Sequence, residues 1–348
     1  MYRKALQSLF ISALIVSHGR EIVGNAIESV LNQDLEKDSY ELIVVADQKL
    51  DSLKRYERDS RLKLVYSDSR DPGGKWAEAI SLAKGDVVSF LDDDDEWVPH
   101  KLKTVRDKFV SDPLLGYYHN CHISIDYNGR ILHDFPELRH YYAMEKIGSY
   151  TVFANRGKDL NLQYLSSLGA PFNSSCISMR KDLLDPYLET LKVGKWMVDY
   201  FWFYVFGISD TRILLEKNPL TLYRRRDDET GDQLNNIKNS RRQKITIYSR
   251  YLQSHTVYRR LSVDLPFESY FNWIILKIEL ILSIYEKKNP VGSRFSSFYN
   301  LYRNIPRGDL NSILSSLLIA LGSLMACASK SIALMFVQSL EILKLSLV

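Results

Sequence analysis

Short apolar runs alternate with helical patterns up to about residue 110, and this alternation constrains the fold more than any other feature. Runs typical of strands cover residues 10–17, 40–47, 62–68 and 86–92, and amphipathic patterns cover residues 20–33 and 75–85. Such alternation is typical of parallel strands joined by crossover helices. Because several runs are apolar on both faces, their strands belong in the middle of a covered sheet. We therefore predict an α/β fold with a mostly parallel, Rossmann-like sheet flanked by helices.

Charge and cysteine content exclude several classes of protein. The 46 Lys and Arg residues nearly balance the 42 Asp and Glu residues, so we expect no nucleic-acid partner. Cys121, Cys176 and Cys327 lie far apart, which fits a reducing compartment and offers neither a disulfide framework nor a zinc spacing. Residues 1–21 have a basic start and an apolar run but no small-residue cleavage site, which favours a first core strand over a signal peptide. We therefore expect a cytoplasmic protein.

Changes in composition divide the chain. Residues 116–135 predict a hairpin with Asn128-Gly129 at its turn, residues 172–179 a strand and residues 194–208 a helix. Beyond residue 240 the chain reads as helical throughout. We therefore expect a domain over residues 1–238, made of halves at about 8–112 and 113–238, and an all-helical C-terminal extension over residues 239–348.

The C-terminal extension has two features of membrane-associated helices. Residues 241–260 combine basic residues with Tyr and Ile at helical spacing, as in a helix lying on anionic lipid, although packed helices share this composition. Residues Ser312 to Ser329 carry no charge over a length close to the minimum for a spanning helix. Several Ser and Gly residues dilute this run and Lys330 ends it, so we favour interfacial or packed helices over a span. Spanning, lying on and packing near a membrane remain alternatives.

Polar side chains follow the predicted strands at the points where they end. They are Ser17, His18, Asp47, Asp68 and Asp92 to Asp95. In doubly wound sheets, ligands bind beyond the carboxyl ends of the strands. We therefore expect these groups to converge on one edge of the sheet.

The stretch GDVVSFLDDDDEWVPHKL, residues 85–102, concentrates four carboxylates behind a buried strand. Carboxylates this close repel one another unless a cation or hydrogen-bond donors neutralise them. Mg²⁺ or Mn²⁺ takes one or two protein carboxylates and fills its other positions with water and phosphate oxygens. The alternative is a helix cap, with Asp94 or Asp95 at the start of a helix near Pro99, but a cap accounts for only one or two acids.

This stretch resembles the Asp-x-Asp strand and the following Trp-x-Pro-x-Lys-Leu of family 2 glycosyltransferases, which have the GT-A fold. The segments LIVSHGREIVGNAIESVLNQ and YELIVVADQKLD add to the resemblance, which covers roughly residues 8–230. It implies that Asp92 and Asp94 form the motif, with Asp93 between them and Asp94 in contact with the metal. In the family, the metal bridges the diphosphate of a nucleotide-sugar.

The resemblance also assigns the donor site. It implies that Ser17 and Asp47 hold the nucleotide, with His18 at the position of the family's usual Tyr. Arg20 and Lys75 open predicted helices, and either could reach diphosphate oxygens. The half at residues 8–112 would then bind the nucleotide-sugar, and the half at residues 113–238 would bind the acceptor.

Asp199 is the candidate catalytic base. Inverting transfer needs a carboxylate that deprotonates the acceptor hydroxyl. The family places an acid pair at the start of a helix, and here Val198 precedes Asp199. The apolar neighbours of Asp199 should desolvate it and raise its pKa, while the alternative is an ordinary acid in the first turn of a helix.

Several polar residues are further candidates for contact with the diphosphate or the acceptor. They are Arg224, Arg225, Asn173, Ser174 and Trp196. The run of Arg224 to Arg226 follows a predicted strand, and its alternative interpretation is a solvated, charged turn.

Together these features predict an enzyme, a hexosyltransferase-type glycosyltransferase that moves a sugar with inversion from a nucleotide-diphosphate sugar. The resemblance favours a UDP-sugar as donor, Mn²⁺ or Mg²⁺ as cofactor, and a glycan or lipid-linked acceptor at the cytoplasmic face of the membrane. Two alternatives stay open: a sugar-nucleotide or glycan binding protein without catalysis, and a nucleotidyltransferase of similar fold.

Overall fold

A computed structural model of the chain describes residues 9–49, 51–132, 147–158, 160–225 and 241–262, together with a few positions between 274 and 282. The chain divides into two compact units, Met1–Glu229 and Thr230–Val348. The apolar run at residues 312–329 and Arg226 lie outside the described residues.

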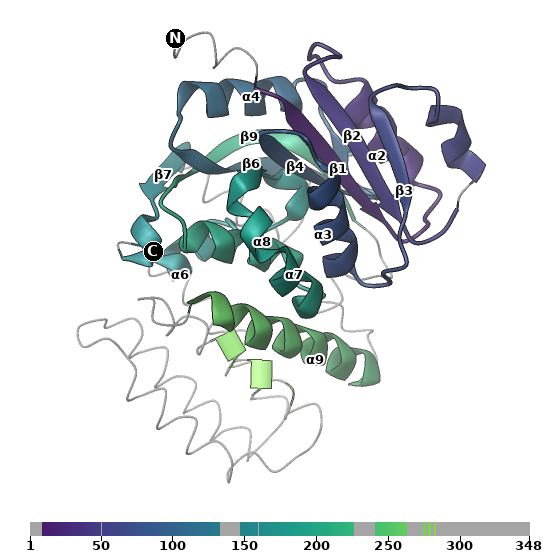
Figure 1. Ribbon diagram of the computed structural model, residues 1–348. Coiled ribbons are helices and arrows are strands. Elements are labelled where there is room, and N and C mark those ends of the chain that lie inside the picture. The colour runs from purple at the N-terminus through teal and green to yellow at the C-terminus, as the bar shows by residue number, and fades with distance from the viewer. Residues whose placement is uncertain are drawn as a thin grey trace. The chain divides into compact units, whose positions relative to one another are not determined.

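The first half of the larger unit contains the predicted strands and helices (Figure 1). The elements are β1 (Ile11–Ser17), α2 (Val23–Leu31), β2 (Tyr40–Ala46), the 3-10 helix η2 (Asp51–Tyr56), β3 (Leu62–Tyr66), α3 (Pro72–Leu82), β4 (Val87–Asp92), β5 (Glu96–Trp97) and α4 (Lys101–Ser111). The side chain of Asp71 caps α3 by accepting a hydrogen bond from the amide of Gly74 at 2.9 Å. The strands predicted from apolar runs are confirmed within a few residues at each end.

The second half adds longer strands and shorter helices. They are β6 (Leu115–Ile125), β7 (Ser149–Phe153), η3 (Asn155–Gly157), α6 (Leu162–Ser167), η4 (Ser174–Cys176), β8 (Ile177–Arg180), η5 (Lys181–Leu183), η6 (Asp185–Tyr187), α7 (Leu188–Gly194), α8 (Val198–Gly207) and β9 (Arg212–Arg224). The predicted strand at residues 172–179 is confirmed only in its last part, which belongs to β8; its earlier part contains η4. The predicted hairpin is described only as far as a bridge between Ile125 and Ile131.

One sheet runs through the described part of this unit, in the order β3-β2-β1-β4-β8-β6-β9-β5, with β7 paired to β9. Strands β3, β2, β1 and β4 are parallel. The chain passes from β1 outward to β2 and β3 and then returns to β4, so the order reverses between β1 and β4. In open α/β sheets this reversal opens a crevice at the carboxyl ends of the strands.

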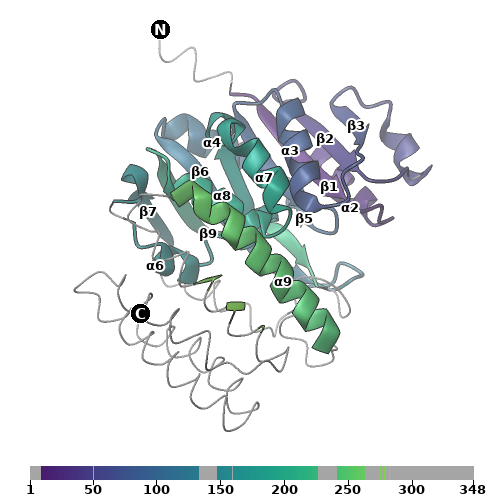
Figure 2. The same cartoon turned by 60° about the horizontal axis from the view of Figure 1, so that its bottom comes forward.

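Helices cover both faces of the sheet. On one face, residues of α2 and α4 join the buried side chains Ile11, Ala13 and Ile15 of β1 in a single core. On the other face, Trp76 of α3 packs edge-on against Phe90 of β4, which stacks on Trp202 of α8. Figure 2 shows α3 and α7 side by side, as their packing contacts require. The predicted α/β architecture, a largely parallel sheet flanked by helices, is confirmed.

The second unit contains α9 (Arg241–Tyr258) and the 3-10 helix η8 (Arg259–Ser262) in its described part. Both elements agree with the helical character expected there. In the part of the chain that is described, no helix combines the length and the apolar character needed to cross a membrane.

Candidate functional site

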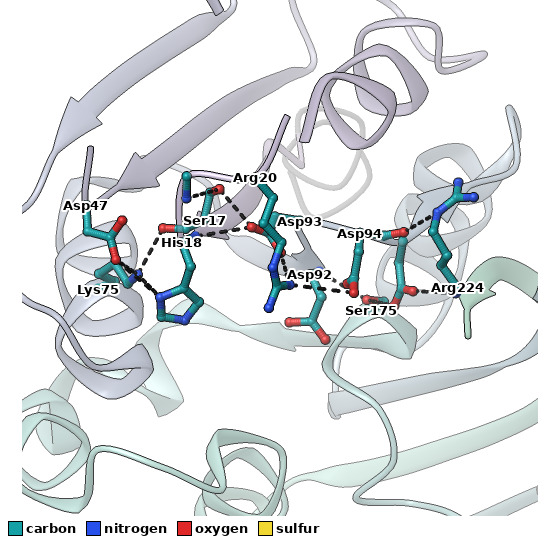
Figure 3. Close-up of polar contacts among 12 residues, drawn as sticks. Ser17, His18, Arg20, Asp47, Lys75, Asp92, Asp93, Asp94, Ser175 and Arg224 are labelled. Carbon is teal, nitrogen blue, oxygen red and sulfur yellow. Dashed lines mark hydrogen bonds and ion pairs between the residues drawn. The ribbon is translucent and has the colours of Figure 1, made fainter. Parts of the chain in front are cut away.

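Most of the predicted site residues lie together at the carboxyl edge of β1, β2 and β4. Figure 3 shows Ser17, His18, Arg20, Asp47, Lys75 and Asp92 to Asp94 in a row, continued by Ser175 and Arg224. The reversal of strand order between β1 and β4 produces this row, because it brings the ends of strands that are distant in sequence to one edge.

Lys75 lies beneath one end of the row and is fully buried. Its ammonium group donates to the carbonyl oxygen of Ser17 at 2.9 Å and to Oδ2 of Asp47 at 3.0 Å, and it lies 2.8 Å from Nδ1 of His18. An ammonium group has three donors and no lone pair, so Nδ1 of His18 accepts from Lys75 in the Nε2–H tautomer, and Oδ2 of Asp47, 3.2 Å from the same Nδ1, then takes its proton from Lys75. The neutral ring then carries its proton on Nε2. All three N–H bonds of Lys75 therefore have acceptors within the protein.

The same contacts set the charges of His18 and Asp47. Burial, and then the charge of Lys75, lower the pKa of His18, so its neutral form is favoured. Burial opposes ionisation of Asp47, but the hydrogen bond and charge of Lys75 outweigh burial and lower the pKa of Asp47. At neutral pH this end of the site presents a neutral imidazole and a carboxylate.

Asp93 ties the end of β1 to the aspartate run. Its carboxylate accepts from Oγ of Ser17 at 2.7 Å, from the amide of His18 at 3.1 Å and from Nη1 of Arg20 at 2.9 Å. Asp93 lies beyond the strand, because β4 ends at Asp92, and its side chain turns toward the predicted donor residues at the end of β1. Arg20 also lies 3.6 Å from Oδ2 of Asp94, so one guanidinium group balances two carboxylates.

Asp95 is buried and supports the loop instead of capping a helix. It accepts hydrogen bonds from Oγ of Ser175 at 2.6 Å, Nδ2 of Asn173 at 3.1 Å and the amide of Arg224 at 2.8 Å. The helix α4 begins at Lys101, well beyond Asp95. The alternative of a cap at Asp94 or Asp95 is therefore wrong.

Arg224 is the last residue of β9 and its side chain is buried. Its Nε donates to the carbonyl oxygen of Asp94 at 2.9 Å, and its Nη1 donates to the carbonyl oxygens of Asp126 at 2.8 Å and Tyr127 at 2.7 Å. Its Nη2 contacts the carboxylate of Glu96. The interpretation of this arginine as part of a solvated turn is wrong, because its guanidinium group is enclosed by backbone carbonyls.

Asp92 and Asp199 both have raised carboxyl pKa values. Burial, and then the negative charge of Asp199, raise the pKa of Asp92 well above its ordinary value, and the three following aspartates add to the effect. Asp199 lies in the first turn of α8, where Ser174 donates a hydrogen bond to its carboxylate. Burial raises the pKa of Asp199 to about 6, although the Ser174 hydrogen bond acts in the opposite direction. The raised pKa predicted from its apolar neighbours is thus present.

Trp196 precedes α8 and is half-buried. Its neighbour Met197 adopts a left-handed backbone conformation with φ of 54°, which is uncommon for a residue with a side chain. Arg225 follows β9 and donates its amide to the carbonyl oxygen of Ile125 at 2.8 Å.

Sequence reasoning missed Lys101, which belongs to the same WVPHKL stretch. Lys101 is fully buried, contacts Oδ1 of Asn120 and lies 5.5 Å from the centre of the Trp97 ring. Burial lowers its pKa to about 7. Asn120 donates to Thr221 at 3.0 Å, and Thr221 donates to the carbonyl oxygen of Ser175 at 2.9 Å. The sequence feature that could have identified Lys101 is its place at the start of a helix, after Trp97 and Pro99.

The aspartate run suits a cation that is bound mainly through its substrate. Nowhere in the described ranges do three or more His, Cys, Asp or Glu side chains form a group that would hold a metal. Mg²⁺ and Mn²⁺ sites that use phosphate oxygens need only one or two protein carboxylates. Asp92 and Asp94 offer these, and their crowded charges favour a cation.

Comparisons with known proteins agree with this geometry. The model of the glycosyl transferase family 2 matches residues 12–187, about half of the chain. An uncharacterized glycosyltransferase of Nostoc sp. is 29% identical over 116 residues, which are 32% of this chain and 35% of the relative. A Campylobacter jejuni GalNAc(5)-diNAcBac-PP-undecaprenol beta-1,3-glucosyltransferase is 30% identical over 129 residues, 34% of this chain and 40% of the relative. The matched segments therefore span well under half of these relatives.

Solved structures extend the likeness to nearly the whole chain. S. aureus TarS 1-349 in complex with UDP-GlcNAc has a TM-score of 0.54 at 15% identity, covering 90% of this chain and 81% of that one. This likeness confirms the expected GT-A-type fold. With half of the chain matched by the family model and the polar row at the predicted sheet edge, the chain belongs to the glycosyl transferase family 2.

Proposed function

We propose that the enzyme transfers a sugar, with inversion, from a nucleotide-diphosphate sugar to a hydroxyl group of a glycan or lipid-linked acceptor. The observation that carries the proposal is the pairing of Asp199, a half-buried carboxylate whose pKa is raised to about 6, with Asp92, whose pKa is raised by burial and then by the charge of Asp199. The UDP-GlcNAc complex of TarS supports a UDP-sugar as donor. The undecaprenol-linked substrate in the name of the Campylobacter relative supports a lipid-linked acceptor.

The nucleotide would bind at the ends of β1 and β2. His18 and Asp47 present a ring and a carboxylate there, with 35% and 11% of their side chains exposed. Ser17 and Asp93 form the floor of this site through their mutual hydrogen bond. Because all three N–H bonds of Lys75 have acceptors, we assign Lys75 the role of holding this floor in place and leave diphosphate contact to Arg20.

Asp94, together with Asp92, would hold Mg²⁺ or Mn²⁺. When bound there, the cation supplies positive charge that stabilises the departing diphosphate. Arg20 pairs with Asp93 at 2.9 Å and lies 3.6 Å from Asp94, so it adds a second positive charge for the phosphate oxygens.

Asp199 would act as the general base. Its carboxylate removes the proton from the acceptor hydroxyl as that oxygen attacks the anomeric carbon from the face opposite the leaving group. The new bond between oxygen and the anomeric carbon forms while the bond to the nucleoside diphosphate breaks, and the proton stays on Asp199. A pKa of about 6 leaves this carboxylate ionised and ready to accept a proton at pH 7.

The other candidates have different roles in this proposal. Arg224, Asn173 and Ser174 are buried and hydrogen-bonded within the protein, so we place them in the support of the site. Arg225 and Trp196 stay candidates for diphosphate or acceptor contact. The donor half at about 8–112, the acceptor half at 113–238 and the separate region at 239–348 are retained as the functional division.

Contact with a membrane at its cytoplasmic face is the second part of the proposal. The described segment from Arg241 to Ser262 contains six Lys or Arg residues and no Asp or Glu. Such a helix is attracted to anionic lipid. Sedimentation of the full chain with vesicles containing anionic lipid, but not with neutral vesicles, would support this; equal recovery with both would reject it.

Turnover tests the proposed function. The full chain is incubated with UDP-, GDP- and dTDP-sugars, Mn²⁺ and candidate acceptors, and release of nucleoside diphosphate is measured, with Asp199→Asn as control. Acceptor-dependent release that the variant lacks is expected. Family membership already favours this outcome over a binding protein or a nucleotidyltransferase, and release of pyrophosphate instead would point to nucleotidyl transfer.

A further inference from the structure

We propose that the dipeptide Ser174–Ser175 is a positioning element that fixes the catalytic base relative to the aspartate run, and that its two hydroxyl groups have separate duties. This inference rests on the proposed function, because it takes Asp199 as the base. Both serines are fully buried, so the earlier expectation that Ser174 contacts the acceptor directly is replaced.

Ser174 holds the proposed base, Asp199, through a hydrogen bond. Its hydroxyl group donates to Oδ1 of Asp199 and accepts from Nε1 of Trp202 at 3.3 Å. An indole nitrogen only donates, so it engages a lone pair of the serine and leaves the hydroxyl proton for Asp199. The Trp202 ring stacks on Phe90 with centroids 4.2 Å apart and planes 6° apart. The direction of the hydroxyl proton is therefore fixed by a ring that is itself held in the core.

Ser175 holds the aspartate run through hydrogen bonds. Its hydroxyl group donates to Oδ2 of Asp95 at 2.6 Å and accepts from the amide of Asp92 at 3.1 Å. Its carbonyl oxygen accepts from Nε1 of Trp97 and from Oγ1 of Thr221, both at 2.9 Å. The residue is therefore bonded to the chain on both sides of Asp93 and Asp94.

Because Ser174 and Ser175 are consecutive residues, their two roles are coupled. Consecutive Cα atoms are about 3.8 Å apart, so one peptide unit links the support of the base to the support of the run. The segment continues into β8, which is paired between β4 and β6 in the middle of the sheet. Because it has little freedom to shift, the separation between the base and the donor diphosphate is fixed before any substrate binds, as efficient transfer requires.

The two serines should therefore give different kinetic defects. Ser174→Ala leaves Asp199 without its side-chain donor, so we expect kcat to fall by about 10- to 100-fold with the donor KM within about threefold of wild type. Ser175→Ala frees the loop at Asp92 and Asp95, so we expect the donor KM and the Kd for UDP with Mn²⁺ to rise by about tenfold. Ser174→Thr keeps the hydroxyl group and should recover most of kcat.

A matched control is available in the same strand segment. Ser178 is equally buried, but its hydroxyl group pairs with that of Ser89 at 2.8 Å, away from the carboxylates. Ser178→Ala should leave both kinetic constants within about twofold of wild type. If Ser178→Ala reproduces either defect, or if Ser174→Ala and Ser175→Ala give the same defect, the proposal is overturned in favour of a general packing role.

A double-mutant cycle separates this inference from the proposed function. If Ser174 acts through Asp199, adding Ser174→Ala to Asp199→Asn should change kcat by less than about twofold. A further tenfold loss in that background would overturn the role of Ser174. Near wild-type transfer by Asp199→Asn alone would instead overturn the assignment of the base. The UDP-binding effect of Ser175→Ala would then still be measured independently, by titration of the full chain.

Discussion

Burial, and then the charge of Asp199 at the start of α8, raise the pKa of Asp92 at the end of β4. The two carboxylates therefore belong to one electrostatic site, although they come from different halves of the unit. One lies on the run that would receive the diphosphate, and the other would remove the acceptor proton.

Asp199→Asn should lower kcat by about 10²- to 10⁴-fold, the usual contribution of a general base, while the Kd for UDP stays within about threefold of wild type. Activity assays and titration with UDP check this. Asp210→Asn is the control, because that carboxylate is 58% exposed and pairs with Arg156 outside the site. A large loss of UDP affinity in Asp199→Asn would argue against a role confined to proton removal.

The same substitution should stabilise the protein. Burial raises the pKa of Asp199 from its ordinary value of 3.8 to about 6, so the charged form is less favourable in the folded state than in the unfolded state. This cost is absent below pH 3.8 and fully present above pH 6. Asp199→Asn should therefore raise the free energy of unfolding by roughly 1 to 3 kcal/mol at pH 8 and by little near pH 4. Urea unfolding at the two pH values measures the difference.

Activity should depend on pH through the same group. The base must be ionised, so kcat/KM should fall as pH decreases through about 6 and level off above it. A pH profile of the wild-type enzyme, with donor at low concentration, locates this acid limb. An acid limb near pH 4 would mean that the base has an ordinary carboxylate pKa.

Lys75→Met should weaken donor binding. The substitution removes the donors that hold Ser17, His18 and Asp47, so we expect the donor KM to rise by about 10- to 100-fold. It also leaves the Asp47 carboxylate without its buried partner, which should cost about 3 kcal/mol of stability. Lys84→Met, at an exposed position after α3, should change neither quantity. An unchanged donor KM in Lys75→Met would contradict the assignment of the donor site to this end of the row.

Arg224→Lys should loosen the aspartate run. Lysine keeps the charge but not the planar fork that joins Asp94, Asp126 and Tyr127. We expect the concentration of Mn²⁺ for half-maximal activity to rise by about tenfold, since Asp94 would be held less firmly. Chelation of the metal with EDTA should abolish transfer in both proteins, and added Mn²⁺ should restore it. Arg212→Lys, at the start of β9, is the control, and full activity in EDTA would refute the role of the metal.

Local patterns were sufficient to predict one half of the fold. Residues 10–17, 40–47 and 86–92 are apolar on both faces, and only the interior of a covered sheet accommodates such strands. The Ser174–Cys176 turn was not predictable in the same way, because Cys176 and Ile177 read as the continuation of a strand. Its departure from strand geometry depends on hydrogen bonds to Asp95 and Asp199, residues that are remote in sequence.

The sequence by itself determined the composition of the candidate site: carboxylates at a strand end, a polar edge of the sheet and an acid among aromatic residues. Tertiary structure alone decided which charged side chains face the ligand and which support it. Lys75 and Arg224 look like phosphate ligands in sequence, yet Lys75 donates to Ser17, Asp47 and the imidazole of His18, and Arg224 donates to backbone carbonyl oxygens inside the protein. The reason is physical: a long basic side chain has the same composition in either role, and its direction depends on acceptors that only the folded chain brings within hydrogen-bond distance.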